Sequence, residues 1–444
     1  MCQIVSESRR SRKLLLGLTG AVYGRGSLPI NGRQLDGNHK QNQSCQTQRG
    51  NQERSNSAIS SPLSGRDLRL DFFRGLALLF IFVDHIPENL FSYFTLQAFQ
   101  FFDAAEVFIF ISGYTAAFVY GRSLHLYGSF YATANIFRRA WQLYVAHIFL
   151  FMIFIAEVSY TVTTFNNPMY NEEMRVADFL GEPHIAIVKA LLLEFQPTFL
   201  DILPLYILLL VIFPAILLGL RFQPLLILIP SFLIYVFVQV TGISVPAYPE
   251  GHVWYFNPLA WQFLFTAGAA LGLGRPFLQR LRHPTGALLA GALLIAATSL
   301  IVKLCWTIHG VWEPFPGVLL KELWPVNKSN LSPIRLVPFF AVVVVVAAYV
   351  RPDARFLHTP AAKPLILCGQ QSLEIFCVGI LLSALGHFLL SEYDSAIGVQ
   401  LAVNAGGVLT LYLIARMIDW YKAMGRSPQP PSRVATSYRQ GDVR

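Results

Sequence analysis

Apolar stretches of about 20 residues, the length that crosses the hydrocarbon core of a membrane, recur from about residue 69 to residue 419. Shorter polar connections separate them. The pattern predicts an all-α polytopic integral membrane protein with about ten transmembrane helices, because a helix satisfies its own backbone hydrogen bonds in lipid. The predicted spans cover residues 69–88, 98–120, 138–161, 199–220, 224–241, 256–274, 286–308, 332–350, 364–390 and 396–419.

The two ends of the chain differ from this apolar region. Residues 1–65 are rich in Gln, Asn, Ser, Gly and Arg and show no apolar period, so we expect a disordered N-terminal tail. Residues 421–444 are polar and basic, and three prolines after residue 427 discourage a helix, so we expect a second disordered tail. A single transmembrane domain over residues 66–420 lies between them.

The overall composition agrees with a membrane protein. Hydrophobic residues make up 54% of the chain and charged residues only 13%, which excludes an ordinary soluble domain. The five cysteines show neither paired nor metal-ligand spacing, which argues against a disulfide scaffold and a zinc site. We therefore expect neither a metal nor a tightly bound cofactor.

The distribution of Lys and Arg predicts the orientation, because positive charge stays on the cytoplasmic side. The even-numbered connections and the C-terminal tail contain fifteen basic residues: Arg122, Arg138, Arg139, Arg221, Arg275, Arg280, Arg282, Arg351, Arg355, Lys363, Lys422, Arg426, Arg433, Arg439 and Arg444. The odd-numbered connections contain four: Arg175, Lys189, Lys321 and Lys328. Both termini are predicted to be cytoplasmic, and topology explains the net charge of +9 without a nucleic-acid partner.

Ionisable residues inside spans are costly and therefore indicate function. Arg74 and His85 in the first span are eleven residues apart, which places them within about 20° of each other on one helix face and about 16 Å apart along the axis. The helix face thus has a cation near its inner end and an imidazole near its outer end. The alternative is that Arg74 anchors the helix at the interface and His85 snorkels outward.

Carboxylates at the outer ends of the first two spans favour a catalytic role for His85. Asp84 precedes it, and Asp103 and Glu106 lie one helical turn apart at the outer end of span two. A carboxylate that orients an imidazole and raises its basicity makes it a general base. We expect Glu106 to be the orienting group, because it lies deepest and is the costliest to leave unpaired.

Further polar residues in or near spans are candidates for substrate binding, although the aromatic belt and interfacial anchoring are alternatives for Trp and Arg. They are Asp201 and Tyr206 in span four, Asn257, Trp261 and Gln262 in span six, Arg335 at the outer end of span eight, and Ser372 and Glu374 in span nine.

Several of these motifs together resemble the OpgC family of osmoregulated periplasmic glucan succinyltransferases, relatives of the acyltransferase-3 superfamily. The resemblance covers about residues 66–420 and rests on the stretches RLDFFRGLALLFIFVDH (69–85), FDAAEVFIFISG (102–113), QPTFLDILPLY (196–206) and NPLAWQ (257–262). The Arg, ten residues, His spacing is typical of the superfamily, and FDAAE and QPTFLDILPLY are more specific to OpgC-like members.

The resemblance implies an acyl-CoA-dependent enzyme of the bacterial inner membrane that moves a succinyl group from cytoplasmic succinyl-CoA to a periplasmic glucan, with possible contact to the glucan synthesis machinery. Arg74 would meet the anionic part of the donor, and His85 would act as base toward a sugar hydroxyl. Because succinyl carries a second carboxylate, we expect Arg335 to bind it through two parallel hydrogen bonds.

Other functions remain open at the level of sequence. Relatives in the wider superfamily transfer other acyl groups. Buried charges and prolines such as Pro204 and Pro258 also suit a transporter of organic anions, although a transporter usually places its binding site at the membrane midplane. A protein that only scaffolds glucan synthesis would not need His85.

Overall fold

Each of the ten apolar stretches forms helix in the computed structural model, which describes residues 67–167, 169–274, 284–307, 326–393 and 395–425. Contacts divide the chain into two units, residues 1–65 and 66–444, and the described residues belong to the second. The tail predicted over residues 1–65 lies outside the described residues. Within the described ranges, six helices are long and apolar enough to cross a membrane.

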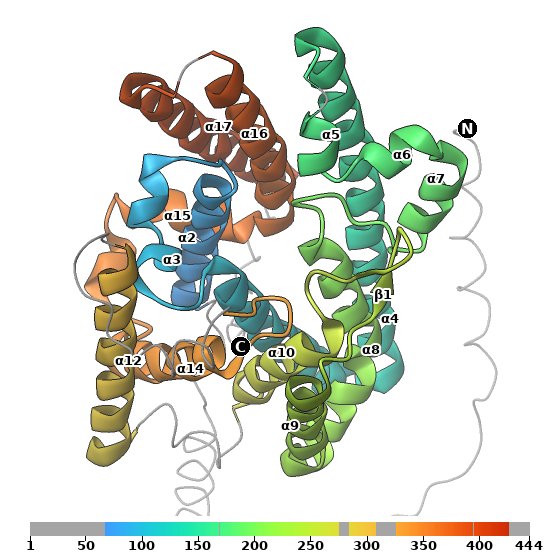
Figure 1. Cartoon of the computed structure of the whole chain (residues 1–444). Coiled ribbons are helices and arrows are strands. Elements are labelled where there is room, and N and C mark those ends of the chain that lie inside the picture. Colours follow the sequence, from blue (N-terminus) through green and yellow to red (C-terminus); the bar gives the residue numbers. More distant parts are fainter. Residues whose placement is uncertain (1–66, 168, 275–283, 308–325, 394, 426–444) are drawn as a thin grey trace, which may run out of the picture. The chain divides into compact units, whose positions relative to one another are not determined.

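The helices follow the order of the predicted spans (Figure 1). Their bounds are α2 Leu68–Asp84, α4 Ala104–Phe165, α8 Ile202–Phe222, α9 Pro224–Thr241, α10 Pro258–Gly272, α12 Gly286–Thr307, α14 Pro333–Tyr349, α15 Ala362–Gln370, α16 Ser372–Glu392 and α17 Ile397–Met424. The six that meet the criteria for a membrane-spanning helix are α4, α8, α9, α12, α16 and α17. The protein is thus an all-α, multi-pass membrane protein.

The second and third predicted spans are both part of α4, and the polar connection expected at residues 121–137 is helical instead. One residue, Gly128, breaks the helix, with φ 84° and ψ 175°. Only glycine adopts this conformation without a clash between Cβ and the backbone. A single glycine therefore separates the two spans where the sequence suggested a longer loop.

Glycine also allows α2 to lie close to α15. A Cβ atom at Gly75 would collide with the backbone of Leu365, and one at Gly369 would collide with the backbone of Asp71. Gly113 of α4 is placed in the same way against Phe265 of α10. Close contact between helix backbones increases dispersion contacts, which are a main source of helix association in a membrane.

Short elements cover the end of the helices where α2 finishes (Figure 1). They are the 3-10 helix Leu90–Phe94, α3 Leu96–Phe99, α5 Met169–Glu173, α6 Ala177–Gly181, α7 Pro183–Leu191, and the strands β1 Pro246–Ala247 and β2 His252–Val253, which pair antiparallel. A second 3-10 helix, Arg355–His358, precedes α15. Helix α7 is apolar but, at nine residues, too short to cross a membrane.

The C-terminal tail begins later than residue 421, where the sequence predicted its start. Helix α17 continues through Tyr421 and Lys422 to Met424, because these residues do not oppose a helix and the first proline of the tail comes only at residue 428. Residues 426–444 lie outside the described residues.

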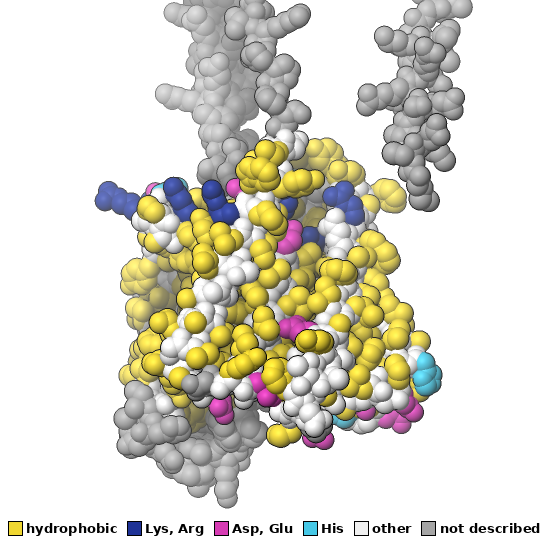
Figure 2. Space-filling model, turned by 90° about the horizontal axis from the view of Figure 1, so that it is seen from above, with side chains coloured by type: hydrophobic (Ala, Val, Ile, Leu, Met, Phe, Trp, Pro, Cys, Tyr) yellow, Lys and Arg dark blue, Asp and Glu magenta, His cyan; other side chains and the backbone are white. Residues whose placement is uncertain are grey.

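Charged side chains are sorted along the molecule on the face drawn in Figure 2. Lys and Arg gather at one edge of a broad apolar band, whereas acidic side chains and His gather mainly at the opposite edge. An apolar band between two polar edges is the surface that a bilayer requires.

Candidate active site

Three adjoining cavities lie beneath the short elements at the C-terminal end of α2. The His85 cavity has a volume of about 270 Å³ and is lined by His85, Asp84, Asp201 and residues of the neighbouring loops. The loop cavity, of about 290 Å³, lies between the α5–α6 segment and the β1–β2 hairpin, and the Lys303 cavity, of about 460 Å³, lies on the other side. Tyr255 lines all three, so the cavities are neighbours.

His85 is the residue that caps the C-terminus of α2, and its ring is held from two sides. Its Nδ1 atom lies 2.6 Å from the carbonyl oxygen of Ile81, and its ring packs edge-on against Phe199 with 4.8 Å between centroids. A carbonyl oxygen can only accept a hydrogen bond, so Nδ1 carries the proton. The other nitrogen, Nε2, therefore has the lone pair that a general base needs.

The expectation that Glu106 orients His85 is wrong. Glu106 is fully buried and accepts a hydrogen bond from Arg335 Nε at 2.7 Å, while its second oxygen accepts one from the backbone N–H of Asp103. Asp103 in turn caps the N-terminus of α4 by accepting from Ala105 N–H. The sequence spacing that looked like a catalytic carboxylate pair is a capping box.

Arg335 is likewise bound to neighbouring side chains. Its guanidinium contacts Glu106 and also donates to Asp103 Oδ2 at 3.0 Å, and the side chain is 9% exposed. A cation neutralised by two buried carboxylates is a poor binder for a third. Arg335 therefore holds α14 to α4, and the role of selecting a dicarboxylic acyl group that the sequence predicted for it does not fit its contacts.

Asp84 lines the His85 cavity and is fixed by neighbours from the following loop. Its Oδ1 atom accepts hydrogen bonds from Thr95 Oγ1 at 2.6 Å and from Gln97 Nε2 at 2.9 Å. Of the three carboxylates that the sequence predicted to be catalytic, only that of Asp84 lies on the His85 cavity without an ion pair to Arg335. It is suited to stabilise a positive charge on the imidazole.

Lys328 lines both the His85 cavity and the Lys303 cavity. Its Nζ atom lies 2.7 Å from Asp103 Oδ2 and 5.6 Å from the centre of the Phe256 ring. Burial lowers the pKa of Lys328, but the acidic groups of Asp103, Tyr255 and Glu106 together more than offset this effect, so the pKa is raised. The cavities therefore contain a permanently charged ammonium group.

Two predicted substrate-binding residues instead hold the loop that carries Lys328. Trp261 is fully buried and its Nε1 donates to the carbonyl of Ser329 at 3.0 Å. Asn257 is fully buried as well and donates to Asn330 Oδ1 at 2.9 Å. Neither lines a cavity described here, so both act by positioning rather than by contact with a ligand.

Other predicted binding residues lie elsewhere in the helix bundle. Gln262 bonds to Ser231 and joins α10 to α9. The Tyr206 ring packs against Phe108 at 6.3 Å between centroids. Glu374, in the first turn of α16, lies 3.6 Å from Lys422, and neither it nor Ser372 lines the three cavities.

Arg74 lies in α2, eleven residues before His85. Its guanidinium donates to Thr115 Oγ1 at 2.7 Å and to the carbonyl of Ile111 at 3.4 Å, which ties α2 to α4. Asp201, which immediately precedes α8, lines the His85 cavity, as a substrate-binding residue would.

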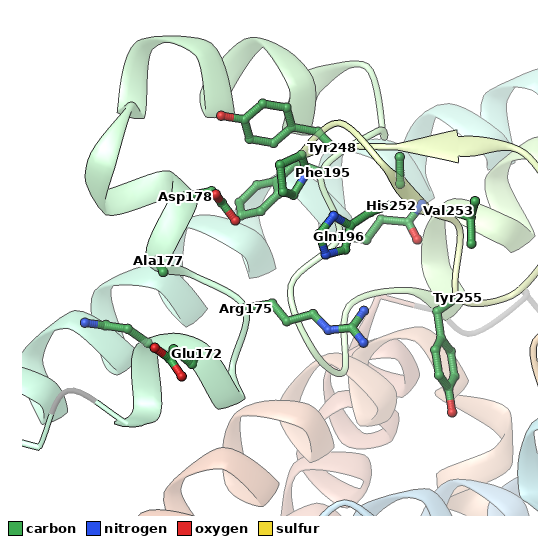
Figure 3. Close-up of a pocket in the computed structure, with 13 residues that line it drawn as sticks. Glu172, Arg175, Ala177, Asp178, Phe195, Gln196, Tyr248, His252, Val253 and Tyr255 are labelled. Carbon is green, nitrogen blue, oxygen red and sulfur yellow. The ribbon is translucent and has the colours of Figure 1, made fainter.

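The sequence drew no attention to Arg175, an exposed residue that lines both the His85 cavity and the loop cavity (Figure 3). Its φ of 53° is left-handed, and two hydrogen bonds, Arg175 N–H to Glu172 and Val176 N–H to Asn171, close the end of α5 around it. Glycine is the usual residue at this position of a helix end. Arginine therefore occupies a site where its backbone is strained.

A signal for Arg175 and Lys328 was present in the sequence. The connections predicted to be outer are poor in basic residues, and the four found there needed an explanation. Lys189 pairs with Glu194 at 2.7 Å, and Lys321 lies outside the described residues. The remaining two line the cavities.

Comparison with known proteins gave one family. The family model described as OpgC protein matches residues 66–423, nearly the whole described part of the chain. No match was found among curated proteins or among solved structures.

Proposed function

The chain belongs to the OpgC family, and we propose that it is a membrane O-acyltransferase that moves a succinyl group from cytoplasmic succinyl-CoA to a hydroxyl of a periplasmic glucan. The observation that carries the proposal is the fixed imidazole of His85 at the edge of a cavity, with Nδ1 bound to Ile81 and Nε2 left to act as a base.

The chemistry is a direct acyl transfer. Nε2 of His85 takes the proton from a glucan hydroxyl, and the oxygen attacks the thioester carbonyl of the donor. The C–O bond forms, the C–S bond breaks, and the leaving thiolate takes the proton back from the imidazolium. Asp84, on the same cavity, stabilises the imidazolium while it exists.

The donor reaches His85 from the inner side of α2. Arg74 precedes His85 by eleven residues on the same face, about 16 Å away along the helix, and supplies positive charge on that route. Its hydrogen bonds to α4 fix the guanidinium between the two helices. An anionic donor such as an acyl-CoA is attracted by such a fixed cation.

The terminal carboxylate of a succinyl group needs a cation at the outer level, because moving a carboxylate out of water is costly when no cation meets it. Arg175 supplies it, since its guanidinium lines the His85 cavity and forms no ion pair with a residue in the described ranges. Lys328 is the second cation there, but Asp103 already neutralises it.

The topology that places these groups has ten membrane crossings with both termini in the cytoplasm of a bacterium with an inner membrane. It is supported by the basic residues of the even-numbered connections and by the sorted charges in Figure 2. In this orientation His85 faces the periplasm and Arg74 lies toward the cytoplasm.

Incubating the purified protein with radiolabelled succinyl-CoA and glucan tests the proposal. We expect label on the glucan with the wild type and none with His85→Ala. Uptake of label into vesicles without transfer would identify a transporter instead, and equal transfer by wild type and His85→Ala would refute the role of His85. A mass spectrum of the glucan product identifies the added group.

A further inference from the structure

The Lys303 cavity carries more positive than negative charge. Lys328 lines it and pairs with Asp103 at 2.7 Å. Arg335 lines it as well and pairs with Glu106, so these four charges cancel. Lys303 is a further cation in the lining, and it forms no ion pair with a carboxylate in the described ranges. The cavity therefore has one uncompensated positive charge, which favours a ligand with a single negative charge.

Lys303 lies on the face of α12 that is turned toward the protein. Ser299 and Thr307 are four residues before and after it, so the three share one helix face. Oγ of Ser299 donates to Oε1 of Gln100 at 2.6 Å. Oγ1 of Thr307 donates to the carbonyl oxygen of Ala98 at 3.2 Å. These two contacts hold the face against residues 98–100, so Lys303 between them faces the cavity and not the surrounding lipid.

The polar groups of the Lys303 cavity are accessible to a ligand. The Lys328 side chain is 28% exposed, and Lys303 is partly exposed. Ser92 and Tyr93 line the cavity too and add two hydroxyl donors. Ammonium and hydroxyl groups suit the tetrahedral oxygen atoms of a phosphate, whereas a carboxylate is best matched by a planar guanidinium. The guanidinium in this cavity, that of Arg335, is already paired.

The Lys303 cavity also lies at the edge of an apolar surface. Helix α12 is long and apolar enough to cross a membrane, and Leu294 and Ile301 on it are largely exposed. Tyr93, which lines the cavity, and its neighbour Phe94 are exposed aromatic residues, a type that is enriched at the depth of lipid headgroups. Basic pockets beside membrane helices bind the headgroups of anionic lipids. A lipid whose acyl chains lie along α12 can therefore place its phosphate in the cavity.

We propose that the Lys303 cavity binds the phosphate group of an anionic phospholipid, with Lys303 and Lys328 as the cations that meet it. The ligand chemistry is a phosphate diester with one negative charge. The cavity shares Gln97, Tyr255 and Lys328 with the His85 cavity, so the bound headgroup lies beside the site of chemistry without occupying it. Lipid binding at this site does not require the proposed acyl transfer.

The test measures binding by native mass spectrometry of the purified protein in a neutral detergent. The ligands are phosphatidylglycerol, zwitterionic phosphatidylcholine and soluble glycerol 3-phosphate. The variants are Lys303→Met and Lys303→Arg, and Lys189→Met is the matched control, because Lys189 pairs with Glu194 and lines none of the three cavities. We expect Lys303→Met to weaken the binding of phosphatidylglycerol by about tenfold, since it removes a hydrogen bond between charged groups. Lys303→Arg, which keeps the charge, and Lys189→Met should bind this lipid as the wild type does.

Thermal unfolding in lipid-free detergent separates a ligand site from a structural role. Lys303→Met removes a cation that has no counter-charge, so its Tm should equal that of the wild type or rise. Unchanged binding of phosphatidylglycerol by Lys303→Met, an equal loss in Lys189→Met, or a fall in the Tm of Lys303→Met would each overturn the proposal. Equal binding of phosphatidylcholine by the wild type would do the same. Binding of glycerol 3-phosphate as tight as that of the lipid, and equally dependent on Lys303, would overturn the lipid as the source of the phosphate.

Discussion

The Nδ1 atom of His85 lies 2.6 Å from the carbonyl oxygen of Ile81, one helical turn earlier in α2. A backbone carbonyl, and not a carboxylate, thus fixes the orientation of the ring and its tautomer. Because the acceptor belongs to the same helix, no change in a side chain elsewhere can remove it. The imidazole is oriented by the end of α2 itself.

Replacing His85 should remove acyl transfer and leave the fold intact. General-base catalysis contributes about 10²- to 10⁴-fold in rate, so His85→Ala should lower kcat by that factor. The ring contacts Phe199 at the edge of a cavity, so the loss of packing is small and Tm should fall little. Glu106→Gln is the informative comparison. If Glu106 were catalytic, this variant would lose activity at a normal Tm. Because Glu106 pairs with Arg335, we expect its Tm to fall instead.

Arg335→Gln should destabilise the protein and not alter its choice of acyl group. The substitution leaves Glu106 buried without its cation, although Asp103 keeps its ion pair with Lys328, and breaking a buried ion pair costs about 3–5 kcal/mol. Thermal unfolding of the purified variant measures the cost. Activities with succinyl-CoA and with an uncharged donor should fall in parallel, whereas selective loss of succinyl transfer at unchanged Tm would restore Arg335 to the substrate site.

Helix positions and the residues near His85 were predictable from the sequence, whereas the pairing of polar groups was not. Hydropathy places helices because it depends on local composition alone. Glu106 pairs with Arg335, which is 229 positions away in the chain, and no local sequence pattern encodes that contact. The same limit explains why Trp261 seemed a substrate-binding residue before its contact with Ser329 was known.

Two tryptophans provide a matched test of the loop that carries Lys328. Trp261→Phe removes the donor to Ser329 and leaves a carbonyl without its partner, so we expect a loss of about 1–3 kcal/mol in stability. Nε1 of Trp254 is buried and has no acceptor among the described residues, so Trp254→Phe should be neutral or stabilising. Chemical denaturation of both variants checks the difference, and equal effects would contradict the assigned role of Trp261.

The orientation in the membrane can be tested with a reporter that is active only in the periplasm. Fusion after Ser391, at the end of α16, should give an active reporter, and fusion after Arg355, in the connection before α15, a silent one. The reason is that the connection around Arg355 is basic and the one around Ser391 is acidic. The reverse pattern would place His85 on the cytoplasmic side and exclude a periplasmic acceptor.

Arg175 allows charge recognition to be tested without harm to the fold. Its backbone is left-handed, a conformation that costs an L-residue about 1–2 kcal/mol and glycine almost nothing, so Arg175→Gly should keep or raise Tm. The lost guanidinium, however, should lower kcat/KM for succinyl-CoA by about 10- to 100-fold, since a hydrogen bond to a charged group contributes about 1.5–3 kcal/mol. Butyryl-CoA has the same chain length but no terminal carboxylate, so its kcat/KM should fall far less.

Lys189→Gly serves as a control for loss of an outer cation, because Lys189 pairs with Glu194 and lines none of the three cavities. A selective loss in Lys328→Met but not in Arg175→Gly would assign the carboxylate to Lys328 instead.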